Sequence, residues 1–297
     1  MRALAEFIMR GRMQAIFVVA GAAAVPMLFW LSAAAGCLVL LRRGVNDALG
    51  VLCWGVLPAL AWWYFGDPRT LLVLLGSFAL ALLLRSQGSW PRVMWCSVGL
   101  GLLYAWGLTL TFGESITALA SELQKALPSV LSDAYQQLSL DERARLESLL
   151  APVLTGLLAA LLQIVTLLSL MLGRYWQASL YNPGGFAKEF RALRLPPLLA
   201  MLLLAGMLLG PSIGVQMAML APICSVPLVF AGVALMHGLV AQKRMSRFWL
   251  VGLYVTLVLF MQLVYPLLAV VAIVDSLFDF RGRASPNGGA GSANGEG

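Results

Sequence analysis

Long apolar runs alternate with short polar segments along most of the chain. The runs cover residues 13–41, 45–65, 70–84, 93–112, 152–172, 196–209, 215–240 and 248–274. A helix needs roughly 20 apolar residues to cross the hydrocarbon core of a bilayer, and most of these runs approach or exceed that length. The pattern predicts an all-α fold, a polytopic transmembrane helical bundle with about eight to ten membrane segments.

Several of these segments are short or contain proline. The run 13–41 is too long for one ordinary span and is divided by Pro26, so it forms either a hairpin of two short helices or one long kinked helix. The run 196–209 is short, and prolines interrupt the next run at Pro222 and Pro227. Broken helices expose backbone groups, which are tolerated only inside protein or around a cavity. These segments favour a cavity among the C-terminal helices.

The one sizeable polar insert lies at residues 113–150. Its apolar residues recur at three- and four-residue spacing, as in Ile116, Leu119 and Leu123, which is typical of an amphipathic helix. Ser139 and Glu142 have the spacing of a capping box that would begin a second helix. We therefore expect an extracytoplasmic pair of amphipathic helices, lying at the membrane surface or over the mouth of the bundle.

Composition supports a membrane location. Only 11% of the residues are charged, against roughly 25% in soluble domains. The net charge of +7 comes from basic residues clustered between apolar runs, as the positive-inside rule would place them in cytoplasmic loops. We expect a multi-pass protein of the bacterial inner membrane whose partner is the lipid bilayer, and no nucleic-acid partner.

The chain is expected to form a single integral membrane domain over residues 1–283, with the N-terminus retained. Residues 284–297 consist mainly of Gly, Ser, Asn and Ala and cannot bury a core, so they are expected to be a disordered tail.

The sequence lacks recognisable catalytic machinery. No GxxxxGK[ST] or HExxH motif occurs, and the chain has one histidine. The four cysteines lie far apart within apolar runs, without metal-ligand spacing. We expect no enzyme, no metal site and no cofactor.

Polar residues within apolar runs are candidates for ligand binding. His237 lies near the cytoplasmic end of its run, where it either caps the helix end or contacts a ligand in a cavity. Gln163, Gln216 and Gln262 lie well inside apolar runs, and hydrogen bonds between helices explain them as well as substrate contact does. The predicted ligand-binding set is Gln216, His237 and Gln262.

Two further places are candidates for contacts between helices or with a partner protein. Ala20 and Ala24 form a small-xxx-small face, suited either to packing within the bundle or to docking a partner subunit. At the other end, Asp275 or Asp279 forms either a helix-end ion pair with a basic residue such as Arg281 or part of a docking site.

The segment from Tyr181 to Phe186 reads Tyr-Asn-Pro-Gly-Gly-Phe, which predicts a turn. With Trp176 as an aromatic anchor at the interface, this loop is either a structured cytoplasmic connector or a docking site. The residues assigned to it are Trp176, Tyr181, Asn182, Pro183, Gly184, Gly185 and Phe186.

The loop at 173–190, the helix that carries His237 and the ending from Asp275 to Arg281 together resemble the YybS-like family of bacterial multi-pass membrane proteins, a domain of unknown function. The resemblance covers most of residues 13–283. That family is distantly similar to the substrate-binding components of energy-coupling-factor vitamin transporters and to the cell-shape protein MreD. In the transporter components, small residues on the first helix dock a transmembrane coupling subunit, a role that the resemblance assigns to Ala20 and Ala24. The insert at 114–150 has no counterpart in the compact six-helix transporter component.

Two functions follow from this resemblance. A small-molecule binding or transport component should contain a sealed, partly polar pocket near the bilayer midplane that includes Gln216 or Gln262. A non-catalytic scaffold or assembly protein of the cell envelope, with an MreD-like role, should have a core filled by side chains.

Overall fold

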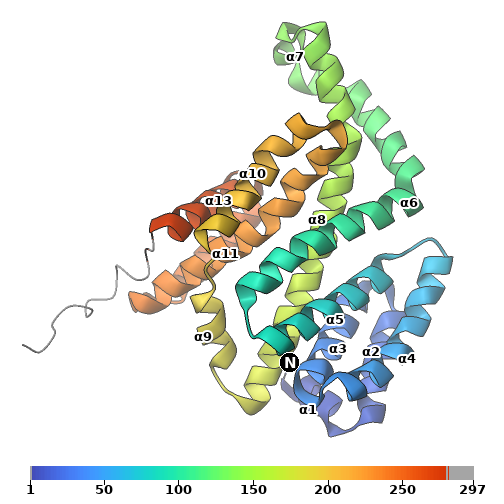
Figure 1. Cartoon of the computed structure of the whole chain (residues 1–297), viewed down its shortest axis with the longest axis vertical. Coiled ribbons are helices and arrows are strands. Elements are labelled where there is room, and N and C mark those ends of the chain that lie inside the picture. Colours follow the sequence, from blue (N-terminus) through green and yellow to red (C-terminus); the bar gives the residue numbers. More distant parts are fainter. Residues whose placement is uncertain (1, 279, 281–297) are drawn as a thin grey trace, which may run out of the picture. The chain divides into compact units, whose positions relative to one another are not determined.

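The computed structural model describes residues 2–278 and residue 280, and within them the secondary structure is helical (Figure 1). The α-helices of the first half are α1 Arg2–Arg10, α2 Arg12–Ala24, α3 Phe29–Arg43, α4 Val45–Tyr64, α5 Arg69–Gln87 and α6 Trp90–Leu131. Those of the second half are α7 Asp133–Gln137, α8 Leu140–Tyr181, α9 Gly185–Ala192, α10 Pro197–Ile213, α11 Leu220–Gln242, α12 Phe248–Leu259 and α13 Met261–Phe278. Two short 3-10 helices, η1 Pro26–Leu28 and η2 Val215–Met219, complete the order.

Seven helices of the described chain are long and apolar enough to cross a membrane. The count rises to eight if α9 and α10, which are bent by 66° relative to each other, form one broken span. The chain is therefore a polytopic α-helical membrane protein, which confirms the predicted fold class. The number of spans lies at or just below the lower end of the expected range.

The chain divides into two compact units. Unit 1 comprises Met1–Glu189 and Leu202–Pro227, and unit 2 comprises Phe190–Met201 and Leu228–Gly297. Each is described by itself below. The single membrane domain expected from the sequence stays a prediction, and the expected tail at 284–297 lies outside the described residues.

In unit 1 the first apolar run forms the hairpin, one of the two alternatives for this run. Pro26 begins η1, which separates α2 from α3. The end of α3 returns to the end of α1, directly before α2, because the Arg43 guanidinium donates to the carbonyl of Met9 (2.8 Å). Deeper in the hairpin, the buried hydroxyl of Ser32 donates to the carbonyl of Val19 (2.7 Å).

The central element of unit 1 is α8, which packs against α3, α5 and α6. Two glycines allow its backbone to approach its neighbours closely. A Cβ at Gly173 would lie 2.7 Å from Cys37 Cβ and 2.8 Å from the carbonyl oxygen of Ala34, both on α3. A Cβ at Gly156 would lie 2.6 Å from the carbonyl oxygen of Met219 in η2. Because these distances are shorter than van der Waals contact, a side chain at either position would clash, and glycine is required at both.

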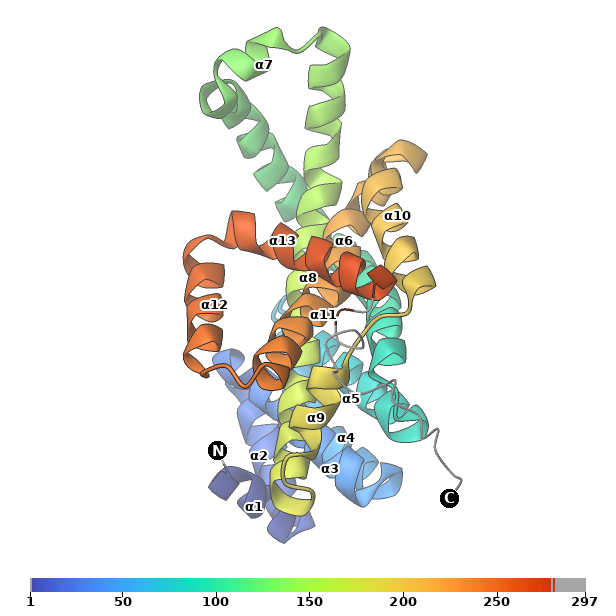
Figure 2. The same cartoon turned by 90° about the vertical axis from the view of Figure 1, so that its left-hand side faces the viewer.

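Beyond the apolar part of unit 1, α6 and α8 continue as a helical hairpin with α7 at its tip (Figures 1 and 2). Each helix has 42 residues, so each is about 63 Å long, roughly twice the thickness of the hydrocarbon core. Within α6 the backbone kinks at Phe112 (φ −125°, ψ 15°). We call residues 113–150 the projecting hairpin.

The structure confirms the helical nature of this insert and the capping box of Ser139 and Glu142. The structure differs from the expectation in one respect. The two helices of the insert are continuations of α6 and α8 and not separate helices. Of the apolar residues of the insert, Ile116 is buried, whereas the side chains of Leu119 and Leu123 are 51% and 40% exposed. That the hairpin lies outside the cytoplasm stays a prediction.

In unit 2, α11 and α13 approach closely where Gly232 faces the carbonyl of Leu268. The last apolar run is divided into α12 and α13 at Phe260 (φ −125°, ψ 44°), and Pro266 lies inside α13. The 12 residues of α12 are too few for an ordinary span.

The close approach at Gly173 gives a first prediction. Gly173→Ala places a methyl group against α3, so the helices must separate, at a cost of about 1–3 kcal/mol. We expect a lower thermal unfolding midpoint for the detergent-purified variant. Gly21→Ala on α2 is the matched control, because a Cβ at Gly21 would meet nothing within 4 Å. Equal midpoints for the two variants would contradict the close packing.

Candidate functional site

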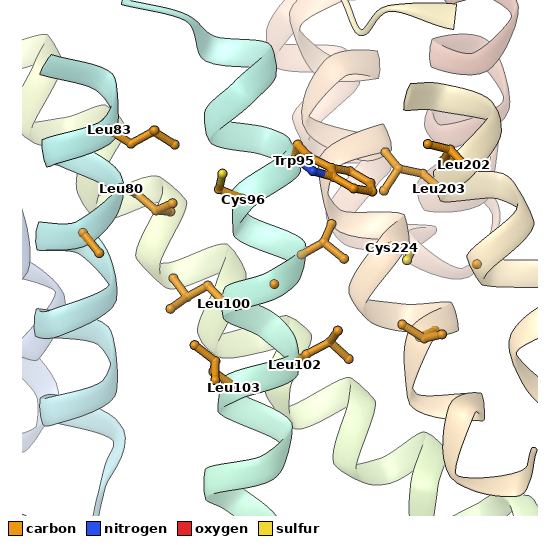
Figure 3. Close-up of a pocket in the computed structure, with 15 residues that line it drawn as sticks. Leu80, Leu83, Trp95, Cys96, Leu100, Leu102, Leu103, Leu202, Leu203 and Cys224 are labelled. Carbon is orange, nitrogen blue, oxygen red and sulfur yellow. The ribbon is translucent and has the colours of Figure 1, made fainter. Parts of the chain in front are cut away.

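A cavity of about 760 Å³ in unit 1 offers room for a ligand. The outer face of α6 forms its floor, and α5 on one side and α10 with α11 on the other form its walls (Figure 3). We call it the α6 groove. Its lining residues are Ala79, Leu80, Leu83, Trp95, Cys96, Val98, Gly99, Leu100, Leu102, Leu103, Leu202, Leu203, Gly206, Leu220 and Cys224.

The lining is almost wholly apolar, and most of the α6 residues that form the floor are exposed. The side chains of Trp95 and Leu103 are 46% and 61% exposed, and a Cβ at Gly99 would meet nothing within 4 Å. In Figure 3, Leu103 extends toward α5 while Trp95 extends toward Leu202 and Leu203 of α10. The volume lies within the roughly 300–1,000 Å³ of small-molecule sites. Such a groove suits an apolar chain or ring.

Basic residues meet at one end of unit 1, which we call the basic end. Arg85 at the end of α5 donates to the carbonyls of Leu40 (3.1 Å) and Leu41 (2.8 Å) at the end of α3. The Gln177 amide of α8 donates to the same Leu41 carbonyl (3.0 Å). The Leu40 carbonyl also accepts from the Gly44 N–H (3.2 Å), whereas a carbonyl in the last turn, such as that of Leu41, needs partners from outside the helix. A cation there also complements the helix dipole. Arg42 stacks on the ring of Tyr181, 3.9 Å from its centroid.

These contacts bring together basic clusters that are far apart in the sequence. The clusters around Arg12, Arg42, Arg85 and Arg174 lie at the same end of unit 1, as the positive-inside pattern requires. The side of the membrane that this end faces stays a prediction. The fifth cluster, at residues 243–247, belongs to unit 2.

Glu189 of α9 forms an ion pair with α8 and accepts a hydrogen bond from α6. Arg174 binds the Glu189 carboxylate through two nitrogens, Nε (3.0 Å to Oε2) and Nη2. The indole of Trp90 donates to the same carboxylate (3.3 Å). Phe186 packs edge-on against both Trp90 and Tyr175. A bidentate, partly shielded pair of this kind holds the loop after α8 in one position.

Polar side chains also join the helices in the core of unit 1. Gln163 of α8 is fully buried and donates to the Ser97 hydroxyl of α6 (2.9 Å), so a hydrogen bond between helices is its observed role. Tyr104 of α6 hydrogen-bonds to the Thr166 hydroxyl of α8 (2.9 Å) and to the Leu72 carbonyl of α5 (3.0 Å).

None of the predicted ligand-binding residues lines the α6 groove. Gln216 in η2 and Gln262 in α13 are exposed. His237 in α11 is half-buried, and its Nε2 lies 2.8 Å from the hydroxyl of Tyr254 on α12. Its ring also packs edge-on against Phe190. A ligand-binding role for these three residues stays a prediction.

The predicted docking residues differ in exposure. Ala24 is exposed and Ala20 half-buried, so this face of α2 is not fully covered within unit 1. Trp176 is fully buried and therefore belongs to the core of unit 1. Gly185 is also buried, and Phe186 is partly covered by aromatic rings.

The remaining loop residues form the expected turn. The Gly185 N–H donates to the Asn182 carbonyl (3.0 Å), and Gly184 has a φ of +83° that favours glycine. Tyr181, Asn182, Pro183 and Gly184 are exposed. Whether a partner docks on them stays open to test.

At the end of α13 in unit 2, Asp275 is buried and accepts from the backbone N–H of Phe280 (3.2 Å). Arg194 donates to the carbonyls of Asp275 (3.1 Å) and Ser276 (3.0 Å), while the Ser276 hydroxyl donates to Leu195 (2.7 Å). These bonds attach α13 to the segment before α10. Asp279 and Arg281 lie outside the described residues.

Among the described residues, no three His, Cys, Asp or Glu side chains lie close enough to hold a metal ion. Comparison of the chain with protein-family models, curated proteins and solved structures gives no match.

The α6 groove was not expected from the sequence. A signal for it exists in the helical spacing of Cys96, Gly99 and Leu103 at positions i, i+3 and i+7, which places them on one face of α6. The sequence does not say whether that face meets another helix or lipid, because apolar residues suit both surroundings.

The ion pair gives a second prediction. Arg174→Glu opposes two carboxylates beside the loop, so the loop should open and chymotrypsin should cleave it several-fold faster in detergent. The double variant Arg174→Glu/Glu189→Arg should restore slow cleavage. Arg2→Glu is the control, because the Arg2–Glu6 pair is exposed and contributes little. A double variant that is cleaved as fast as the single one would contradict this role of the pair.

Proposed function

We propose that this chain is a small-molecule binding or transport component of the bacterial inner membrane and that the α6 groove is its binding site. The groove itself carries the proposal. Its volume of about 760 Å³, on the outer face of α6 between α5 and α10 with α11, lies within the range of small-molecule sites and favours the binding function.

The chemistry of the lining suggests the class of ligand. Apart from the indole of Trp95 and the thiols of Cys96 and Cys224, the groove presents aliphatic side chains and glycine. A strongly polar metabolite would lose its hydration there without gaining hydrogen bonds. The ligand is therefore apolar or amphipathic, in contrast to the partly polar pocket expected around Gln216 or Gln262.

The proposal also uses the resemblance of the chain to the YybS-like family. That family is distantly similar to the substrate-binding components of energy-coupling-factor transporters. The exposed Ala24 on α2 is compatible with the docking of a coupling subunit on that helix. The basic end supports a cytoplasmic orientation of the loop after α8.

The second candidate is the non-catalytic scaffold of the cell envelope. The projecting hairpin favours it, since a pair of helices extending well beyond the apolar part of unit 1 offers a surface for protein partners. Exposed apolar residues on it include Leu119, Val130 and Leu140.

One experiment separates the two functions. The protein is purified from native membranes in mild detergent, and retained small molecules and proteins are identified by mass spectrometry. Gly99→Trp places a large ring in the open space of the groove, and we expect it to reduce the retained small molecule at least tenfold. Gly21→Trp is the matched control, an exposed helical glycine outside the groove with equally open surroundings.

Retention that is lost in Gly99→Trp and kept in Gly21→Trp supports the binding function. Equal retention in both variants would place the molecule elsewhere. Envelope or division proteins that co-purify with wild type and with Gly99→Trp, without any small molecule above background, would favour the scaffold.

A further inference from the structure

The α6 groove has a polar end. On α6, Cys96, Gly99 and Leu103 line the groove, and Arg92 lies four residues before Cys96. Positions i, i+4, i+7 and i+11 share one face of a helix, so Arg92 continues the floor of the groove by one turn. Arg92 is exposed.

The wall formed by α5 ends in the same way. Leu80 and Leu83 line the groove, and Gln87, the last residue of α5, follows them at i+7 from Leu80. The Arg92 guanidinium donates to the Gln87 side-chain oxygen (2.8 Å). The groove-lining residues of α5 and those of α6 therefore lead to the same polar pair, Gln87–Arg92, at the turn between the two helices.

The surroundings of this pair are suited to a negative charge. No Asp or Glu occurs between Arg69 and Phe112, which covers all of α5 and the membrane part of α6. Glu189, which accepts from Trp90 at the start of α6, is already paired with Arg174. Within the described residues Arg92 forms no ion pair and makes its one hydrogen bond to Gln87.

We infer that the α6 groove binds an anionic phospholipid of the surrounding bilayer, with an acyl chain along Gly99 and Leu103 and the phosphate at Arg92. This inference rests on the proposed binding function and narrows its ligand class. An arginine at the membrane interface binds a phosphate through several parallel N–H donors. The apolar floor of the groove contacts the acyl chain in place of the neighbouring lipid chains. Gln87 holds the guanidinium over the end of the groove.

The test compares two lipids with identical acyl chains. Phosphatidylglycerol and phosphatidylcholine are added separately to detergent-purified full-length protein, and binding is measured by native mass spectrometry. We expect wild type to prefer phosphatidylglycerol about fivefold, the effect of one basic residue near an anionic lipid surface. Arg92→Gln should bind both lipids equally, and Arg92→Lys should keep the preference.

A matched control separates this site from the general charge of the basic end. Arg10 is exposed next to Met9 at that end but lies on neither α5 nor α6. We expect Arg10→Gln to keep the wild-type preference. An unchanged preference in Arg92→Gln, or an equal loss in Arg10→Gln, would overturn the inference.

Failure of the inference and failure of the proposed function give different results. If Gly99→Trp weakens binding of both lipids but Arg92→Gln changes nothing, the groove binds apolar chains without selecting the headgroup. If Gly99→Trp leaves the binding of both lipids unchanged, neither lipid occupies the groove and the inference is overturned. The proposed function is then decided by the small molecules retained in the co-purification experiment. Inorganic phosphate should not compete, because it lacks the acyl chain.

Discussion

The architecture of unit 1 depends on how closely α8 approaches the helices around it. At Gly156 and Gly173 the backbone of α8 comes within reach of backbone atoms in η2 and α3, a contact that any side chain would prevent. In a membrane, lipid tails compete with apolar side chains for the same surfaces, so close backbone packing and buried hydrogen bonds hold helices together. Between α8 and α6 the buried hydrogen bonds are Gln163–Ser97 and Tyr104–Thr166.

The α6 groove is a consequence of this arrangement. Because α8 packs on the inner face of α6, where Ser97, Gly101 and Tyr104 are buried, the outer face with Trp95, Gly99 and Leu103 remains open. The side walls are supplied by α5 and by α10 with α11. The same register places Arg92 at the end of the open face, so the floor changes from apolar to charged near the membrane interface. A groove of this kind suits a molecule with an apolar part and an anionic part.

The sequence predicted the fold class, the break at Pro26, the capping box at Ser139 and the turn after Tyr181, because each has a local signal in proline, glycine or helical spacing. It did not predict that the insert continues α6 and α8, because the apolar run ends at Phe112, directly before Gly113, whereas the helix continues past both residues. Nor did it reveal the groove, because an apolar helix face looks the same whether it meets lipid, another helix or a ligand. The clustering of Arg12, Arg42 and Arg85 at one end was inferred from charge, whereas their carbonyl and ring contacts depend on tertiary packing.

The most direct test of the account is an experimental density map of the full-length protein in lipid nanodiscs that contain phosphatidylglycerol. The account predicts elongated density along Gly99 and Leu103 that ends in a headgroup at Arg92. A map in which α5 or α10 closes onto α6, or in which the groove is open but holds no ordered chain, would contradict it.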